Sequence, residues 1–546
     1  MSASDTAAPR RWAAVAPAWP VLRRALYLTH RWLGIAGCLL FVIWFLSGLV
    51  MMFVGYPALT QAERLTGLAP LRTDQVRVNP AAVWRELPDA VRARPPRRMT
   101  LEMMATATPE GDAFQPVWRV VDAKGRAHAW SAVNGRALGP VDATAATRIG
   151  QAFSRSPGAR VVETLDRDQW TVPQGLDALR PLHRVEVGDA AGTMLYISAV
   201  TGEVVRDTTR HERFWNWLGS VPHWLYFTPL RADPPLWRTV VLWVSGAGIA
   251  SAVSGMVIGL MRVRLRQRFK NGSCSPYRGW MRWHHLTGLM GGLLVCTWVA
   301  SGWLSMDPNR WFQRTGSDEA AQLRWQGPFT PDLSALGPPP LPDARELQLL
   351  SFDGRLLMQW RDAAGHRQVV DARTGTAFAL SDEDLTAAAR RFMPDATPPA
   401  LQWLDREDAH WYSHHGTRVL PVWRVRFTDA ALTWLHVDPA NGQILGVSQA
   451  QARWRRWLFN APHSLDFPWL IQRRPLWEVV TGLLLAAGSI VAISGMVIGW
   501  RRLRHPSRRR SGAQDAKGAD GAKGTKGTKG TKGAKGTKGA KGAKGA

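Results

Sequence analysis

The sequence predicts an α-helical membrane protein with an internally duplicated four-helix transmembrane core and two α+β domains outside the membrane. Three observations lead to this prediction: four long apolar runs, the basic residues that flank them, and a self-similarity of the chain at two fixed offsets. Two long polar blocks separate the runs, so the chain alternates between segments suited to lipid and segments suited to water.

The four apolar runs are predicted to be transmembrane helices. Crossing a hydrocarbon core about 30 Å thick takes about 20 apolar residues in a helix, and each run is long enough. Their middles carry no charged residue, and tryptophans stand at their edges, as is usual at membrane interfaces. We place the transmembrane segments at 28–54, 236–261, 283–306 and 476–500.

The net charge of +27 is concentrated in three segments. Residues 1–31, 262–282 and 501–546 carry net charges of +4, +7 and +13, so the rest of the chain carries only +3. We expect no nucleic-acid partner, because a nucleic-acid-binding surface would spread its positive charge over a folded domain. Basic segments beside apolar runs instead mark the cytoplasmic side. The sequence therefore predicts a multi-pass protein of a bacterial inner membrane, in contact with lipid, with both termini in the cytoplasm.

The first apolar run follows basic residues, so a cleaved signal peptide is an alternative to an anchor. The run is longer than the usual apolar region of about 7–15 residues, and no small-x-small cleavage site follows it. We therefore expect an uncleaved anchor. The predicted order is a cytoplasmic N-terminus (1–27), transmembrane segment 1 (28–54), periplasmic region 1 (55–235) with an interfacial segment (212–230), transmembrane segment 2 (236–261), a basic cytoplasmic loop (262–282), transmembrane segment 3 (283–306), periplasmic region 2 (307–475), transmembrane segment 4 (476–500) and a basic low-complexity cytoplasmic tail (501–546).

Two further features concern the parts outside the membrane. The last 36 residues repeat Lys-Gly-Ala or Lys-Gly-Thr, which predicts a disordered cationic tail rather than collagen, since the repeat contains no proline. Neither periplasmic region contains a cysteine, so no disulfide can cross-link either region. We expect each region to be held by a hydrophobic core of its own.

The chain matches itself at offsets of 254 and 240 residues. At the first offset, HRWLG at 30–34 matches HHLTG at 284–288. At the second, PHWLYF at 222–227 matches PHSLDF at 462–467, and SGMVIG at 254–259 recurs. The repeated unit is a span, an external region and a span, in parallel orientation. Such a duplication predicts a pseudo-two-fold axis along the membrane normal, with equivalent side chains meeting across it.

The external regions have the pattern of α+β domains. Alternating runs broken by a turn glycine, such as VWRVVDAKGR at 117–126 and TMLYISAVTGEVV at 193–205, predict β-hairpins. Residues 381–393 have helical spacing instead. We therefore expect a helix packed on a short antiparallel sheet, twice over in each region.

Four histidines form two pairs that the duplication makes equivalent, His30 with His284 and His223 with His463. A two-fold axis would bring each pair face to face, as two axial ligands of a b-type haem must be. Histidines that only form hydrogen bonds at the interface are an alternative, and so is zinc, although zinc prefers four ligands close together. His285 adjoins His284 and is the alternative ligand there, but the alignment of the repeats favours His284.

Other residues add to this picture without deciding it. Small residues follow the histidines at spacings that would let a flat macrocycle approach a helix, or that serve helix packing alone. The external histidines are expected to be surface or core residues. Neither a dinucleotide-binding fingerprint nor a phosphate-binding loop is present, so electrons would have to come from a partner. The glycines are Gly34, Gly37, Gly48, Gly288, Gly291 and Gly302, and the external histidines are His183, His410, His414 and His415.

Several separated motifs resemble the PepSY-associated transmembrane family. They include DQWT at 168–171, RPLHRVEVGD at 180–189, ERFWNWLGSVPHWLYFTPL at 212–230 and SHH followed by LPVWRVRF within 413–427, and the resemblance covers about residues 22–505. It implies four core helices and two periplasmic PepSY-like domains. Some members resemble iron-regulated inner-membrane proteins that act as di-haem reductases of ferric siderophores.

The resemblance implies a function for the histidine pairs. His30, His223, His284 and His463 match positions where such reductases would hold two haem b groups through the haem iron. The electron donor would be a quinol or a reductase, and the substrate a ferric siderophore or another periplasmic ferric compound; no catalytic residue is implied. The alternative is a non-enzymatic, membrane-anchored PepSY module that binds peptides or proteases or acts as a sensor. A transporter is disfavoured, because the spans offer few polar groups at the bilayer centre.

Overall fold

The structure is a computed structural model that describes residues 18–108, 111–270, 272–312, 319–333, 336–396, 399–414, 416 and 418–504. Its contacts divide the chain into two compact units, Met1–Trp500 and Arg501–Ala546, and all the histidines discussed below belong to the first. The predicted lysine- and glycine-rich tail and most of the predicted N-terminal segment lie outside the described residues.

Within the described residues, four helices are long and apolar enough to cross a membrane. α9 shows how the sequence starts such a helix: the side chain of Asp233 accepts a hydrogen bond from the backbone of Leu236, and prolines occupy the first turn, where no backbone donor is needed. The four helices are α1 (Ala18–Met51), α9 (Pro234–Arg262), α10 (Gly279–Ser305) and α16 (Leu476–Arg504).

Small residues let the apolar helices pack closely. A Cβ atom at Gly488 would lie only 2.4 Å from the ring of Phe45, and one at Gly248 would lie 3.1 Å from a methyl group of Val299. Buried serines satisfy their hydroxyls within their own helix, as Ser254 does on the carbonyl of Ala250. The core between the helices consists of Val42, Phe45, Val295, Trp298, Val299, Leu485 and Ala492.

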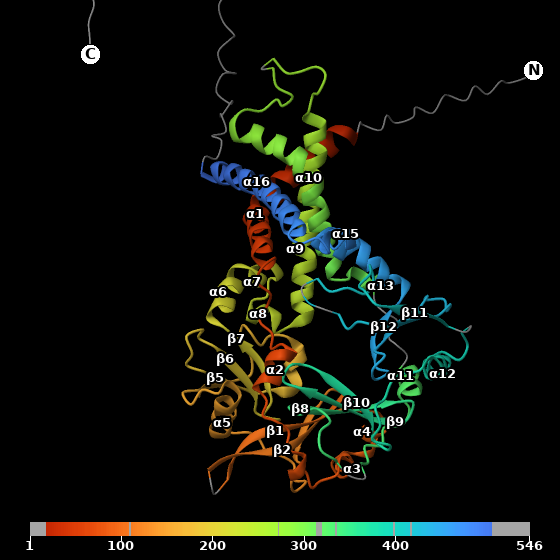
Figure 1. The fold of residues 1–546 in the computed structure, drawn as a ribbon. Helices are drawn as coiled ribbons and strands as arrows, with labels where there is room; N and C mark the ends of the chain where they lie inside the picture. The colour runs from red at the N-terminus through yellow and green to blue at the C-terminus, as the bar shows by residue number, and fades with distance from the viewer. Residues whose placement is uncertain are drawn as a thin grey trace, which may run out of the picture. The chain divides into compact units, whose positions relative to one another are not determined.

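The largest sheet has six strands and draws on both polar regions (Figure 1). Its order is β10-β9-β8-β1-β2-β3, and the central β1–β8 pair is antiparallel, with Met99 opposite Leu349 and Glu102 opposite Glu346. The first region supplies β1 (Arg98–Thr108), β2 (Gly111–Val121) and β3 (Ala127–Ser131); the second supplies β8 (Ala344–Phe352), β9 (Arg355–Asp362) and β10 (Arg367–Asp371).

The shared sheet corrects the expectation that each polar region is held only by its own core. One hydrophobic cluster mixes residues of both, such as Leu101 and Trp118 from the first region with Leu347 and Trp360 from the second. Each region also has a separate cluster, one around Ile149 and the other around residues such as Leu385. The two regions are therefore joined by strand pairing and by a common core.

Among the described residues, each region also contains one four-stranded antiparallel sheet with a helix packed on it. Two such units were expected in each region, but the other strands join the shared sheet. In the first region, Ile149 of α5 packs with Val185 and Ile197 of the sheet; in the second, Phe392 of α12 packs with Val425. The elements are α5 (Ala143–Ser154), β4 (Arg160–Leu165), β5 (Leu182–Glu186), β6 (Met194–Ser198) and β7 (Val204–Thr208), then α12 (Asp382–Phe392), β11 (Ala400–Leu404), β12 (Val422–Arg426), β13 (Trp434–Val437) and β14 (Ile444–Ser448).

The local predictions for these regions are confirmed. The hairpins expected at 117–126 and 193–205 turn at Gly125 and Gly202, with φ of +85° and +67°, a conformation that glycine adopts without strain. The helix expected at 381–393 is α12. Period-two and period-3.6 patterns thus identified the elements correctly.

Short helices lead from each four-stranded sheet back toward the long helices. After β7 come α6 (Arg210–Leu218), α7 (Ser220–Trp224) and α8 (Thr228–Arg231). After β14 come α13 (Ala450–Arg455), the π-helical turn η4 (Arg456–Asn460), α14 (Ala461–Ser464) and α15 (Pro468–Ile471). The remaining helices are α2 (Gln61–Gly67), η1 (Thr73–Gln75), α3 (Pro80–Arg85), α4 (Asp89–Arg92), η2 (Gln174–Leu179), η3 (Pro308–Arg310) and α11 (Glu319–Gln326).

Candidate functional site: two pairs of histidines

The structure places the four histidines in two facing pairs. His30 of α1 and His284 of α10, the first pair, have ring centroids 6.1 Å apart and planes inclined by 23°. His223 of α7 and His463 of α14, the second pair, have centroids 6.2 Å apart and planes inclined by 64°. Residues separated by about 250 positions in the chain are thus brought together at nearly the same distance twice.

In the first pair, the Nδ1 atom of each ring is held by a neighbouring helix. Nδ1 of His30 lies 2.9 Å from the carbonyl oxygen of Ser251 on α9. Nδ1 of His284 lies 2.9 Å from the hydroxyl of Ser494 on α16. A ring nitrogen that faces a carbonyl must carry the proton, so Nε2 of His30 keeps its lone pair free.

The second pair is held in the same way. Nδ1 of His223 lies 3.0 Å from the hydroxyl of Ser47 and 3.2 Å from the carbonyl of Trp44, both on α1. Nδ1 of His463 lies 3.1 Å from the hydroxyl of Ser301, and 3.2 Å from the carbonyl oxygen of Trp298, both on α10. The carbonyls favour the tautomer with the proton on Nδ1, which leaves Nε2 as the available ligand atom in both rings.

A glycine on the facing helix makes room for each ring. A Cβ atom at Gly255 would lie 2.4 Å from Cε1 of His30. The corresponding distances to Cε1 are 3.2 Å from Gly495 to His284, 3.2 Å from Gly302 to His463 and 3.6 Å from Gly48 to His223. Each of these glycines follows a serine, in Ser-Gly dipeptides at 47–48, 254–255, 301–302 and 494–495.

The sequence points to two of these four glycines, Gly48 and Gly302, but only as residues that follow His30 and His284 on the same helices. Gly255 and Gly495, which lie beside the rings of the first pair, were missed. All six glycines singled out from the sequence follow His30 or His284 on the same helix. Of these, a Cβ atom at Gly288 would meet nothing within 4 Å, and one at Gly291 would pack on Val491. The signal that could have identified the glycines beside the rings is the Ser-Gly dipeptide, which recurs at both offsets of the repeat, at 47–48 with 301–302 and at 254–255 with 494–495.

The short helices that carry the second pair end in unusual backbone geometry. Leu225 and Leu465, each two residues beyond its histidine, have φ of +53° and +52°. Leucine rarely adopts this left-handed conformation, because its Cβ crowds the following carbonyl. The conformation ends each helix directly after the histidine and turns the chain away, and it occurs at equivalent places in both halves.

Each pair has the separation that two ligands of one metal ion require. A metal–imidazole bond of about 2.0 Å and a ring centre roughly 1.1 Å from its nitrogen place two opposed rings about 6.2 Å apart. A zinc site would need two further protein ligands. Among the residues that the structure describes, no three His, Cys, Asp or Glu side chains come together in such a group. Each pair thus offers two facing imidazole ligands.

His285, the alternative to His284, uses both ring nitrogens for structure. Its Nδ1 lies 2.8 Å from the hydroxyl of Ser275, and its Nε2 lies 3.0 Å from the carbonyl of Gly259. The residue is buried and ties the loop after α9 to α10. Because Nε2 faces a carbonyl, it carries a proton there, so these contacts favour His284 as the ligand.

The other histidines stand apart from the two pairs. His183 is buried, with Nδ1 2.8 Å from the hydroxyl of Thr164 and Nε2 2.7 Å from the carbonyl of Val141, so the core alternative applies to it. His414 forms an ion pair of 2.5 Å with Asp466. His410 packs its ring against two tryptophans. His415 lies outside the described residues.

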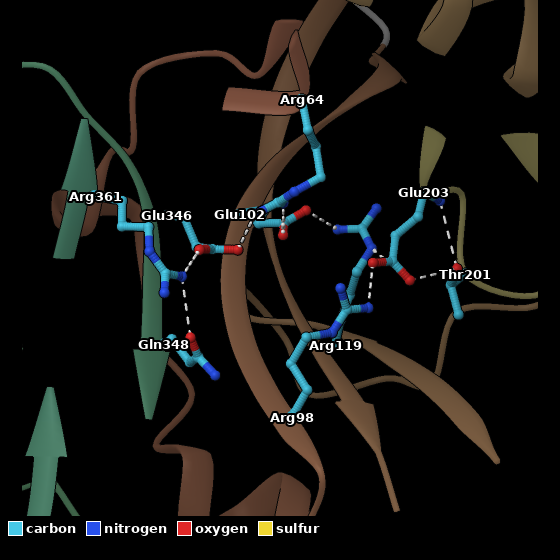
Figure 2. A network of polar contacts seen from close by, with 9 residues as sticks. All are labelled: Arg64, Arg98, Glu102, Arg119, Thr201, Glu203, Glu346, Gln348 and Arg361. Carbon is cyan, nitrogen blue, oxygen red and sulfur yellow. Dashed lines mark hydrogen bonds and ion pairs between the residues drawn. The ribbon is translucent and has the colours of Figure 1, made fainter. Parts of the chain in front are cut away.

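A second polar cluster crosses the six-stranded sheet, away from the histidine pairs. Figure 2 shows Arg64 of α2 between Glu102 and Glu346, the carboxylates that the β1–β8 register places opposite each other. Arg119 contacts Glu102 on one side, and Arg361 lies 2.6 Å from Glu346 on the other. Arg64 thus bridges strands of both polar regions.

The pKa of Glu102 shows the net effect of the charges in this cluster. Burial raises the pKa of its carboxyl, but the guanidinium groups of Arg64, Arg119 and Arg98 together outweigh burial and lower the pKa to about 2. Glu102 therefore remains ionised although only 2% of it is exposed. These ion pairs join the two halves of the shared sheet, because Arg64 bonds both to Glu102 of β1 and to Glu346 of β8.

The fold and the two pairs define a class of protein: a multi-pass membrane protein with four membrane-crossing helices, sheet-containing regions between them and paired histidines between its helices. The chain belongs to the family described as the PepSY-associated TM region, whose family model matches residues 27–373. This range contains His30, His223 and His284 but ends before His463. A comparison with curated proteins gives no match.

Proposed function

We propose that the protein is a haem b electron-transfer protein of a bacterial inner membrane that reduces a ferric siderophore, or another ferric compound, on the periplasmic side. The observation that carries the proposal is the geometry of the two pairs: Nδ1 of each imidazole is anchored, and the rings face each other at 6.1 Å and 6.2 Å. Histidines that served only as interfacial hydrogen-bond groups would account for the anchoring but not for two equal separations.

We also infer that the chain consists of two copies of one unit. The support is the recurrence of the same contact at both offsets. Ser47 holds His223 as Ser301 holds His463, and each of these serines precedes the glycine that seats the ring. The first strands of the β4–β7 and β11–β14 sheets also begin 240 positions apart. Two copies around one axis explain why ligands come in pairs.

The spacing along the helices supports a path across the membrane. Ser47 follows His30 by seventeen positions on α1, and Ser301 follows His284 by seventeen on α10, so the two pairs differ in height by about 25 Å. Aromatic side chains fill part of the interval, where the rings of Phe45 and Trp298 lie 5.5 Å apart. With the basic segments in the cytoplasm, the first pair lies on the cytoplasmic side and the second on the periplasmic side.

The protein's own residues would position the ligands and exclude water. A haem held at each pair would supply one-electron chemistry, which the protein tunes through the ligands, their hydrogen bonds and the dryness of the site. The Nδ1 contacts orient each imidazole, and those made to carbonyls also set its tautomer. Electrons would come from a quinol or a reductase. Siderophores bind the hard Fe(III) ion far better than Fe(II), so reduction would release the iron.

The first test is an absorption spectrum of the detergent-purified full chain, oxidised and then reduced with dithionite, with haem measured per chain. We expect two haems and a sharp α-band on reduction. His30→Ala and His223→Ala should each leave about one haem, whereas His211→Asn, a control on the exposed face of α6, should keep both. A colourless chain produced with ample haem would refute the proposal and favour a membrane-anchored peptide- or protease-binding module.

A further inference from the structure

Arg231, the last residue of α8, is a buried cation without a hydrogen-bond partner for most of its guanidinium group. The residue is only 8% exposed, and neither its Nε nor its Nη1 has a partner among the described residues. Arginine stays protonated in proteins, so the positive charge cannot be avoided by losing a proton. Burying such a charge without compensation is strongly unfavourable.

Other buried arginines of the same chain show the usual solution. Arg206 donates to the carbonyl of Pro57, and Arg456 donates to the carbonyls of Ala409 and Asp466. Each of them has one guanidinium nitrogen without a partner among the described residues, whereas Arg231 has two. The side chain of Arg231 lies over two aromatic rings: its Cζ lies 5.0 Å from the centre of the Tyr226 ring and 4.8 Å from that of Trp237. Cation–π contacts offset only part of the cost of burying a charge.

The aromatic neighbours connect Arg231 to the second histidine pair. The indole nitrogen of Trp237 donates to the carbonyl of Trp224, at 2.9 Å, and Trp224 is the residue directly after His223. The rings of Trp224 and Tyr226 lie 5.2 Å apart. A chain of contacts therefore leads from Arg231, through Trp237 and Trp224, to the residue next to His223.

We propose that Arg231 binds a carboxylate of the haem held by His223 and His463. This inference rests on the proposed function. A guanidinium fork matches a carboxylate in geometry and charge, which would supply the missing compensation. Because the group is almost fully buried, a bulky soluble chelate could not reach it, whereas the carboxylate arm of a group seated between the helices could.

The residue at the position of Arg231 also differs between the two halves of the chain. At an offset of 240, Arg231 corresponds to Ile471, which is a buried apolar residue. The cation is therefore not a feature that the repeat requires. Only the first half of the chain supplies this cation, so the haem held by His223 and His463 would be bound asymmetrically.

The test combines a substitution with a change in the haem. The full chain is loaded with haem or with haem dimethyl ester, whose carboxylates are blocked, and the rate at which the haem at His223 and His463 is lost to an excess of a haem-scavenging apoprotein is measured. A charge-assisted hydrogen bond between Arg231 and a free carboxylate cannot form with the ester. With haem, Arg231→Met should therefore speed the loss about tenfold. With the ester, Arg231→Met should leave the rate unchanged.

The outcomes separate the possibilities. An equal acceleration with haem and with the ester would show that Arg231 acts through packing or through its charge alone and not through a carboxylate, and no acceleration with either would also overturn the inference. Arg213→Met, which removes a cation from α6 whose guanidinium is already bonded to backbone carbonyls, is the matched control. If Arg231→Met does not fold, Arg231→Gln serves instead. A wild-type chain without haem would refute the proposed function itself, before Arg231 is tested.

Discussion

Replacing Gly255 by alanine should displace the imidazole of His30 more than the same substitution at Gly48, Gly302 or Gly495 displaces the imidazole beside it. Carbon atoms in ordinary contact lie about 3.5–4.0 Å apart. The new Cβ would lie 2.4 Å from Cε1 and 2.8 Å from Nδ1 of His30, so the ring would have to move by more than 1 Å. The hydrogen bond between His30 and Ser251 would be strained by the same movement.

The magnitude follows from the cost of overpacking. Forcing an extra methyl group into a packed site costs about 1–3 kcal/mol. That corresponds to a roughly 5- to 150-fold loss in affinity for a ligand held by His30. At Gly48 the new atom would lie 3.6 Å from His223, an ordinary contact, so Gly48→Ala should have almost no effect. Gly302→Ala and Gly495→Ala, at 3.2 Å, should fall between these extremes.

The assay is the haem content of each purified variant and the rate at which it loses haem to an excess of a haem-scavenging apoprotein. Gly288→Ala is the matched control, because its Cβ would meet nothing within 4 Å although it lies one turn from His284. Haem loss from Gly255→Ala that is no faster than from Gly48→Ala would refute the view that glycines seat the imidazoles.

Three further substitutions test the surroundings of the site. Arg64→Met should lower the free energy of unfolding by about 3–5 kcal/mol at pH 7.5, since it leaves buried carboxylates short of a partner. The pKa of Glu102 is about 2 in the fold against an ordinary 4.5, so its stabilisation is complete above pH 4.5 and is lost as the pH falls toward 2; unfolding curves of both proteins should converge in that window, and a constant difference would contradict this account. Burial raises the pKa of Asp207 from 3.8 to about 6, so its ionised form opposes folding above pH 6; Asp207→Asn should stabilise the chain by about 1 kcal/mol at pH 7.5 and by nothing at pH 3.5, as measured by thermal unfolding. His285→Asn should keep both haems while making the loop after α9 easier to cleave with protease, and loss of one haem would instead identify His285 as a ligand.

The repeat made the histidine pairs predictable, because the self-match of the sequence alone identifies His284 and His463 as the counterparts of His30 and His223. Local patterns likewise predicted the hairpin at Gly202. These features depend on short stretches of chain or on a direct comparison of two stretches.

The remaining features depend on contacts between distant residues. Nothing in the alternation of β1 says that its partner is β8, and the bridge from Arg64 to Glu346 spans 282 positions. The seat of His30 likewise lies on another helix, at Gly255. Arg231 has no counterpart in the other half, so a comparison of repeats could not single it out. Arg231 stands out because its side chain is buried, and local sequence patterns do not predict which arginine is buried.

The pairing of β1 with β8 has a consequence for how the chain is made. β1 is complete at Thr108, but its partner begins at Ala344, and the helices α9 and α10 come between them. During synthesis the edge of β1 therefore stays unpaired until two more helices have entered the membrane and more than 200 further residues have emerged. Unpaired edges invite association with other chains, so the first region needs protection during that interval. A fragment that ends after α9 should consequently aggregate, whereas the complete chain closes its own sheet.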